Sequence, residues 1–499
     1  MSLIKLTSTP DILNCIADLS NDEIFTSPKL ANSILDTLPP KLWRDPNIKF
    51  LDPCSKTGVF LREIAKRLNN GLKNYIKNSK KRAEHIFLNQ LYGISITQLT
   101  SLMSRRTLYY SKFSMGKNSI CQKFNNNDGN VYYKSYSHIW KNNLCLSCSA
   151  KKNIYDRENR EVYAYPFLHD KNIFNKMKFD VIIGNPPYQL EDGGFGKSAS
   201  PVYHEFVEQA MRLNPSYLTM IIPARWYSGG KGLDEFRSKL LNDERISQLH
   251  DFPETSDCFP GQNIRGGVCY FLWEKNYKGK TNVKNYKGGN LISETHRDLK
   301  TNGEDLFVRY NEGINILNKI KRFGEDNFDK LVSSRKPFGL PTNFESFKKE
   351  SSSRFNIKLF RFGKNGYINE NQTEINRDLI YKYKVIVPYS SPGGDEYPHS
   401  VLSTPLISKP NTCCTETYLV IGPFKNQKIC ENVISYMKTR IFRFLVLLLK
   451  NTQHVTRKNY IFVPTQNFNE NWTDKKLYKK YNINNKEINF IESLVREMN

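Results

Sequence analysis

The chain has 499 residues, 39% of them hydrophobic and 13% aromatic, which is enough for two or three domains with a sizeable core. Its 74 basic and 49 acidic residues give a formal charge of +25, which favours a polyanionic partner such as nucleic acid. A merely lysine-rich composition is the alternative. The longest apolar run, residues 444–449, is too short to span a bilayer, and the N-terminus lacks the unbroken apolar segment of a signal peptide. The sequence therefore predicts a cytoplasmic protein with no membrane partner, whose cysteines stay reduced or bind metal.

The first predicted element is a capped helix within residues 25–38 (FTSPKLANSILDTL). Thr26 or Ser27 can cap it, because a side-chain oxygen there accepts a hydrogen bond from a free backbone N–H of the first turn. Pro28 suits the first helical position, where no backbone donor is needed. The apolar residues after it recur at helical spacing, so one face of the helix is expected to be buried.

Two strands are predicted to follow this helix. Residues 48–60 (IKFLDPCSKTGVF) indicate a strand, a turn of small residues and the start of another helix. In a doubly wound sheet this layout places a ligand at the strand end and the helix N-terminus. Residues 91–97 (LYGISIT) indicate the second strand, with Ser95 near its end, where a side chain can bond a ribose.

Residues 180–189 (DVIIGNPPYQ) predict a buried strand that runs directly into a stiff turn. Gly184 lets the backbone bend, and the two prolines restrict the conformation of the residues that follow. The turn presents the Asn185 amide, backbone carbonyls and the Tyr188 ring. Such a turn can hold a planar group with an exocyclic amine. A proline-rich surface turn with Tyr188 merely packed is the alternative.

These segments, in this order, resemble the gamma-type N6-adenine DNA methyltransferases of restriction–modification systems, including the single-chain type IIG enzymes. The family's Asn-Pro-Pro-Tyr motif matches residues 185–188. The resemblance implies a doubly wound α/β domain, Rossmann-like and dependent on S-adenosylmethionine, over residues 1–275. It also implies a mixed α+β target-recognition domain over residues 276–499.

The resemblance further implies that S-adenosylmethionine is the cofactor, bound mainly by the first helix, the loop after the first strand and the end of the second strand. The implied cofactor-binding residues are Thr26, Pro28, Asp52, Pro53, Thr57, Gly58, Phe60, Ser95 and Asp170. The sequence departs from the family pattern at Lys56, where glycine is usual, and at Ser95, where an acidic residue is usual. For Asp170 and the neighbouring His169, a surface loop is the alternative.

The reaction is implied to take place at the turn, on an adenine flipped out of the duplex at a cost of a few kcal/mol. Tyr188 would stack on this base, while the Asn185 side chain and the Pro186 carbonyl accept hydrogen bonds from its amine. Further contacts with the base or the DNA are expected at Phe195, Arg225, Trp226, Phe259 and Arg265. Core packing is the alternative for Trp226.

Residues 111–160 do not fit a compact Rossmann-like unit and are interpreted as an insertion. They contain Cys121, His138, Cys145 and Cys148, the last three spaced His-x6-Cys-x2-Cys. Four such ligands in one polar segment predict a structural Zn²⁺ site. Scattered free thiols and an exposed histidine are the alternative.

The second half of the chain has a different texture. Residues 277–289 are rich in lysine and glycine and are interpreted as a boundary. Beyond them, basic and aromatic residues alternate, as in residues 440–444 (RIFRF) and 457–460 (RKNY). This pattern favours a surface that recognises DNA. An ordinary accessory domain is the alternative.

The sequence as a whole predicts a site-specific adenine methyltransferase that acts on double-stranded DNA, with a separate restriction endonuclease subunit as a further partner. Two alternatives stay open at this point. One is an RNA or protein-glutamine methyltransferase of the same fold. The other is a non-catalytic DNA-binding specificity subunit.

Overall fold

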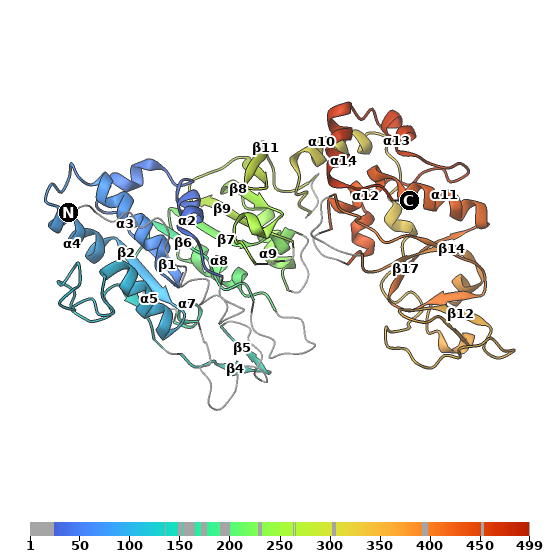
Figure 1. Cartoon of the computed structure of the whole chain (residues 1–499), viewed down its shortest axis with the longest axis horizontal. Helices are drawn as coiled ribbons and strands as arrows, with labels where there is room; N and C mark the ends of the chain where they lie inside the picture. The colour runs from blue at the N-terminus through green and yellow to red at the C-terminus, as the bar shows by residue number, and fades with distance from the viewer. Residues whose placement is uncertain are drawn as a thin grey trace. The chain divides into compact units, whose positions relative to one another are not determined.

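The protein divides into two compact units, Met1–Leu299 and Lys300–Asn499, drawn from blue to yellow-green and from yellow to red in Figure 1. The computed structural model describes residues 24–134, 136–147, 152, 165–170, 177–189, 200–227, 232–262, 264, 266–301, 306–391, 398–450 and 454–498. The division falls later than the expected boundary after residue 275. Residues 281–297 form a hairpin that pairs with the sheet of the first unit, so they belong to that unit.

The first unit is built on a nine-stranded sheet with the order β11-β10-β8-β9-β7-β6-β1-β2-β3. Its strands are β1 (Phe50–Ser55), β2 (Leu91–Ser95), β3 (Val131–Tyr132), β6 (Val181–Gly184), β7 (Tyr217–Pro223), β8 (Ile246–Phe252), β9 (Val268–Glu274), β10 (Thr281–Lys287) and β11 (Asn290–Arg297). Strands β3, β2, β1, β6 and β7 run parallel, whereas β9 is antiparallel to both of its neighbours. The chain builds outward in opposite directions from β1 and from β6. The carboxyl ends of these two paired strands therefore mark the switch point, the place where α/β sheets bind ligands.

Both faces of this sheet are covered. Val181 and Ile183 of β6 pack in the core formed with α2 and α3, and Ile182 points to the opposite face but is equally buried. Each such side chain contributes roughly 1.5–3 kcal/mol by its burial. The helical segments of the unit are α2 (Pro28–Leu35), η1 (Pro40–Arg44), α3 (Val59–Gly71), α4 (Ser79–Asn89), α5 (Gln98–Tyr109), α7 (Pro166–His169), α8 (Tyr203–Arg212), η2 (Ala224–Tyr227), α9 (Asp234–Leu241) and η3 (Thr255–Asp257).

The start of α2 follows the sequence prediction. Ser27 is the cap, and its Oγ accepts a hydrogen bond from the Leu30 backbone N–H at 3.2 Å. Pro28 occupies the first turn. Outside the large sheet, the unit has a small hairpin of β4 (Trp140–Lys141) and β5 (Leu144–Cys145), which lies in the predicted insertion.

The second unit is mixed α and β, with two three-stranded sheets ordered β13-β12-β16 and β15-β14-β17. Its elements are α10 (Asn311–Lys321), η4 (Phe328–Leu331), β12 (Ile357–Phe360), β13 (Gly366–Ile368), η5 (Glu370–Gln372), η6 (Arg377–Tyr381), β14 (Tyr383–Pro388), β15 (Leu406–Ser408), β16 (Thr412–Cys414), β17 (Tyr418–Phe424), α11 (Gln427–Lys438), α12 (Arg440–Leu447), η7 (Arg457–Tyr460), α13 (Asp474–Lys480) and α14 (Asn485–Leu494). Within the described ranges, no helix combines the length and the apolar character needed to cross a bilayer.

The basic and aromatic run at the start of α12 is core, which corrects its interpretation as a DNA-binding surface. Phe442 and Phe444 are fully buried. The Arg443 guanidinium is also buried and donates hydrogen bonds to the carbonyls of Ser400 and Arg496. Burial lowers the pKa of Arg443 to about 10, and these carbonyls satisfy its donors. Alternation of basic and aromatic residues alone cannot distinguish a buried helix from a nucleic-acid surface.

Candidate functional site

The candidate site lies where β1 and β6 end side by side, at the switch point of the sheet. Gly184, the last residue of β6, lets the two strand ends approach closely. A Cβ atom at this position would lie 2.8 Å from Cys54 Sγ and 3.2 Å from Asp52 Oδ1. Glycine is therefore required at this position by packing against the neighbouring loop.

Asn185 follows Gly184, and its side chain is held by two hydrogen bonds. Its Nδ2 donates to the Ile24 carbonyl at 2.9 Å and to Thr26 Oγ1 at 3.1 Å. A carbonyl can only accept, so these contacts determine which end of the amide is the nitrogen. The opposite end, Oδ1, is buried and accepts no hydrogen bond from any described residue. A buried acceptor of this kind is costly unless a ligand donates to it.

The Tyr188 ring is buried in the core of the unit rather than presented on the surface. Its edge packs on Phe259, with ring centroids 6.4 Å apart and an interplanar angle of 71°. Burial raises the pKa of the Tyr188 phenol well above its ordinary value, so the hydroxyl stays protonated. In this conformation Tyr188 is therefore a packed core residue, as in the alternative interpretation of the sequence. Stacking on a base would require the ring or its surroundings to move.

Asp52 ends the apolar part of β1 and is almost completely buried. Burial raises its pKa to about 7, against the lowering effects of the Cys54 N–H, which donates to Oδ1 at 3.2 Å, and of the Lys56 charge. The Lys56 Nζ donates to the Ile24 carbonyl at 3.0 Å. The lysine that replaces the usual glycine therefore reaches the same carbonyl as Asn185. Ile24 could not be predicted from residue type, because it acts through its backbone carbonyl.

Gly58 is the residue before α3 and has a φ of +73°, a conformation that glycine adopts without strain. A Cβ atom there would lie 3.1 Å from the Ser104 Cα of α5. Ser104 also supports the loop, since its Oγ lies 2.9 Å from Ser55 Oγ. Ser95, at the end of β2, pairs with Ser55 in register, and its buried Oγ has no hydrogen-bond partner in the described part of the chain.

Some of these groups suit the cofactor that the sequence implies. The N-terminus of α3 suits the approach of a polar ligand. Lys56, however, reaches across the loop, and the Ser95 hydroxyl is fully buried. One small pocket contains several of the predicted residues. It is lined by Phe25, Thr26, Asp52, Cys54, Lys56, Thr57, Gly58, Val59, Phe60 and Asn185. The pocket therefore joins the predicted cofactor loop to the predicted catalytic asparagine.

The other predicted contact residues do not gather at this pocket. Trp226 is a core residue rather than a DNA contact, since it is buried and packs on Tyr227 and Phe236. Arg225 beside it is half-buried. The Asp170 carboxylate accepts a hydrogen bond from the Tyr136 hydroxyl. Pro53 and Pro186 are buried in the strand end and in the turn, and Phe195, Arg265 and Cys148 lie outside the described residues.

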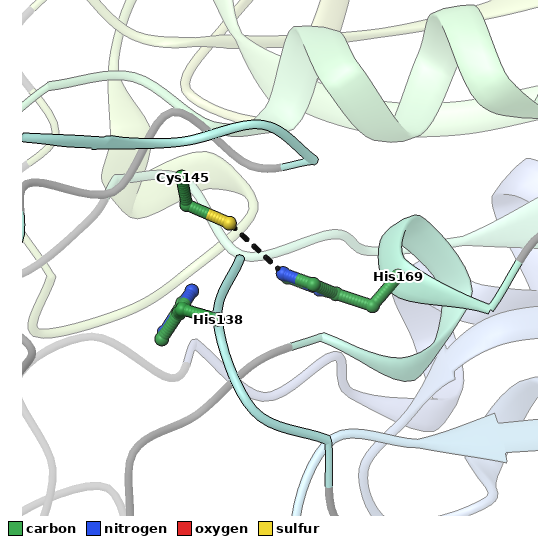
Figure 2. Close-up of side chains that lie close together, drawn as sticks. All are labelled: His138, Cys145 and His169. Atoms are coloured by element: carbon green, nitrogen blue, oxygen red, sulfur yellow. Dashed lines mark hydrogen bonds between the residues drawn. The ribbon is translucent and has the colours of Figure 1, made fainter. Parts of the chain in front are cut away.

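The predicted metal ligands are only partly brought together. His138 and Cys145 are neighbours, and the third group beside them is His169 of α7, with the ligand atoms of all three within 4.8 Å of one another (Figure 2). Cys121 is not in this group. It is buried in the main core of the unit, in the same cluster as Tyr109, so its assignment as a ligand is corrected. The sequence does not indicate His169 as a ligand, because its distance along the chain from Cys145 matches no common metal motif.

Known proteins with similar sequences are methylases, in agreement with the sequence prediction. The family model of the Eco57I restriction-modification methylase matches residues 89–259. A protein from Mycoplasma pneumoniae, described as an uncharacterized adenine-specific methylase, is 37% identical over 355 residues, which cover 65% of this chain and 83% of that protein.

One solved structure supports the fold, and a second is reported with it. The type ISP restriction-modification enzyme LlaGI, solved as a nuclease-deletion mutant in complex with a DNA substrate mimic, is 12% identical with a TM-score of 0.51, over 91% of this chain and 47% of LlaGI. The M protein of the type I restriction enzyme EcoKI is 12% identical with a TM-score of 0.35, over 55% of this chain and 51% of that protein. The chain thus spans about half the length of these two proteins. On the strength of the Mycoplasma relative and the family model, the chain belongs to the restriction-modification methylases.

Proposed function

We propose that this protein transfers a methyl group from S-adenosylmethionine to the N6 amine of an adenine in double-stranded DNA, as the modification activity of a restriction–modification system. The family supports methylation in such a system. The formal charge of +25 supports a nucleic-acid substrate. The adenine specificity and the flipping of the base are inferred from the turn at residues 185–188.

The observation that supports the proposal best is the orientation of the Asn185 amide. Its nitrogen is held by Ile24 and Thr26, so its oxygen is the group left for a substrate. An exocyclic amine donates hydrogen bonds and suits this acceptor. A second amine hydrogen can be accepted by the carbonyl of Pro186 in the same turn.

When bound, S-adenosylmethionine supplies an electrophilic methyl group. Asn185 Oδ1 holds the amine in one orientation, which directs the nitrogen lone pair along a single line. It would also stabilise the positive charge on the amine as the N–C bond forms, while the methyl–sulfur bond breaks and S-adenosylhomocysteine is the leaving group. The extra proton then leaves the amine for water, and no covalent intermediate with the protein is needed. The chain thus acts by orientation and electrostatics.

The reaction can be tested with the purified protein, isotopically labelled S-adenosylmethionine and duplex DNA of mixed sequence. Digestion and mass spectrometry should find the label on N6-methyladenine. Parallel reactions with RNA and with a protein extract should remain unlabelled. Label on RNA or on a protein side chain would replace the proposed substrate. The absence of labelling in all three reactions, with the protein folded, would overturn the proposal.

The support given by Thr26 can be tested separately. Thr26→Val keeps the size of the side chain but removes the hydroxyl that accepts from Asn185 Nδ2. Loss of one hydrogen bond of about 1 kcal/mol predicts a roughly fivefold lower kcat, with little change in KM for DNA. Thr37→Val is the control, because the Thr37 hydroxyl bonds the Ile34 carbonyl at the end of α2 instead. An unchanged kcat in Thr26→Val would show that this hydrogen bond does not position the amide.

A further inference from the structure

The hairpin of β4 and β5 brings Cys145 close to His138. Trp140 pairs with Cys145 across the two strands, and the Leu146 N–H donates to the Ile139 carbonyl at 3.0 Å. The turn residues Asn142 and Asn143 have φ values of +50° and +62°. Two consecutive positive φ values are the geometry of a tight two-residue hairpin, and asparagine tolerates this geometry better than most residues. The local sequence therefore explains why these two segments meet.

His169 approaches the hairpin from α7 in a defined orientation. Its Nδ1 lies 3.0 Å from the carbonyl of Tyr165, which can only accept, so Nδ1 carries the proton. This leaves the lone pair on Nε2, which lies 3.2 Å from Cys145 Sγ (Figure 2). A backbone carbonyl that orients the second nitrogen of a ligating histidine is a common feature of metal sites.

His138 completes the convergence. Its ring stacks on Trp140 at 4.7 Å and meets the edge of the His169 ring at 5.3 Å. Ligand atoms around a tetrahedral zinc ion lie about 3.5 Å apart. The Cys145 sulfur and the His169 Nε2 are 3.2 Å apart, and all three ligand atoms lie within 4.8 Å of one another, so they are close enough to share one ion. A catalytic Cys–His pair would need an accessible thiol, whereas Cys145 is only 3% exposed.

Hydrophobic burial does little to hold this hairpin in place. Its strands have two residues each, and the apolar side chains of Ile139, Leu144 and Leu146 are 58%, 45% and 64% exposed. An isolated hairpin of this size is marginal in water. In contrast, α7 is anchored to the nine-stranded sheet of the first unit, called the methylase sheet below. Phe167 of α7 stacks on Phe206 of α8 with ring centroids 5.9 Å apart, and α8 packs against β7 of that sheet.

We propose that His138, Cys145 and His169 bind a zinc ion that ties the β4–β5 hairpin to α7 and so to the methylase sheet. Cys145 would bind as the thiolate, its proton passing to solvent when the metal enters. These three ligands leave one position of a tetrahedral ion for water or a further donor. Cys148, which the sequence also predicts as a ligand, lies outside the described residues. This site is independent of the proposed methyl transfer, since its role is structural.

Metal analysis of the full-length protein tests the site. The wild type should contain about one zinc ion per chain. Replacement of zinc by Co²⁺ should give the visible absorption of tetrahedral cobalt and a sulfur-to-cobalt charge-transfer band. Cys145→Ser should lose that band, and His169→Gln should lower the metal content. His169→Cys, which restores a ligand, should regain zinc if the site only needs a donor there.

Two control variants keep the experiment specific. Cys121→Ser removes a buried cysteine of the same unit, and His296→Gln removes an exposed histidine of β11. Both should retain zinc. A wild type that binds neither Zn²⁺ nor Co²⁺ would overturn the proposal. So would loss of zinc in Cys121→Ser with retention in His169→Gln, since this would restore the ligand set predicted from sequence.

Limited proteolysis gives a readout that does not depend on metal counting. Lys141 is exposed in the hairpin, so trypsin can cleave after it when the hairpin opens. Removal of zinc by a chelator should speed this cleavage at least tenfold in the wild type, and added Zn²⁺ should reverse the effect. Cleavage that is equally slow with and without zinc would show that the metal does not hold the hairpin.

Discussion

The turn after β6 and the β4–β5 hairpin both present polar side chains on short, conformationally restricted loops, but they are held in different ways. Strand β6 lies between β1 and β7 with both faces buried, and Gly184 packs directly on Cys54 and Asp52. The hairpin has exposed apolar side chains and converges on three potential metal ligands. The candidate catalytic turn is therefore organised by the sheet, whereas we propose that the hairpin is held by a metal ion.

The largest effect is expected from Asn185→Ala, which removes the acceptor from the turn but leaves the sheet intact. The methylation rate should fall roughly 10²–10³-fold, as when one oriented polar group is removed from an active site. Binding of DNA and of S-adenosylmethionine, measured by calorimetry, should change little. Asn242→Ala, an exposed amide after α9, is the control. A rate within twofold of the wild type would remove Asn185 from the mechanism.

Asp52 predicts an effect of pH on the stability of the cofactor-free protein. Its pKa is about 7 in the fold and lies near 3.8 in the unfolded chain, so the folded state holds the proton more tightly. The contribution of Asp52 to the free energy of unfolding should therefore be largest below pH 4. It should decrease as the pH rises to 7, by an amount on the order of 4 kcal/mol. Above pH 7 this contribution should be constant.

The variant Asp52→Asn should remove this decline, so its gain over the wild type should be largest above pH 7. Urea unfolding at pH 5 and pH 8 measures the difference. Asp298→Asn, an exposed carboxylate, is the control. A difference between Asp52→Asn and the wild type that does not grow with pH would contradict a buried carboxyl with a raised pKa. The same variant should bind the cofactor poorly if Asp52 belongs to its site.

Gly184→Ala tests whether packing holds the turn. The added Cβ would meet Cys54 Sγ at 2.8 Å, so the strand ends must separate slightly. Overpacking of this kind predicts a loss of about 1–3 kcal/mol in the free energy of unfolding. Gly279→Ala, whose Cβ would meet only the end of the Tyr277 side chain, should be nearly neutral. Equal stability of the two variants would show that the turn tolerates expansion.

The smallest effect is expected in the hairpin. Asn143 has a φ of +62°, and a β-branched residue in this conformation costs roughly 1–2 kcal/mol. Asn143→Val should therefore open the hairpin more often and speed tryptic cleavage after Lys141 roughly five- to thirtyfold, while thermal unfolding of the sheet is unchanged. Asn143→Gly should cleave like the wild type. A loss of thermal stability in Asn143→Val as large as in Gly184→Ala would show that the two loops are held alike.

Several features of the fold could be predicted from local sequence because local physics determines them. The cap at Ser27 and the strand before Gly184 follow from side-chain hydrogen bonding and an apolar run. Other predictions were wrong because the residues next to an aromatic side chain in the sequence do not show whether that side chain is buried or exposed. Trp226 and Phe442 are core residues, although each stood in a context that also fits a DNA surface.

The sequence by itself determined the family, the order of the loops and the identity of the turn at residues 185–188, because these depend on residues adjacent in the chain. Only the tertiary structure decided that Asn185 Nδ2 is held by Ile24, that Tyr188 is packed, and that His169 lies beside His138 and Cys145 while Cys121 does not. Each of these contacts joins segments far apart in sequence. They arise when the sheet and its helices pack together, and residue spacing alone does not encode which distant groups then meet.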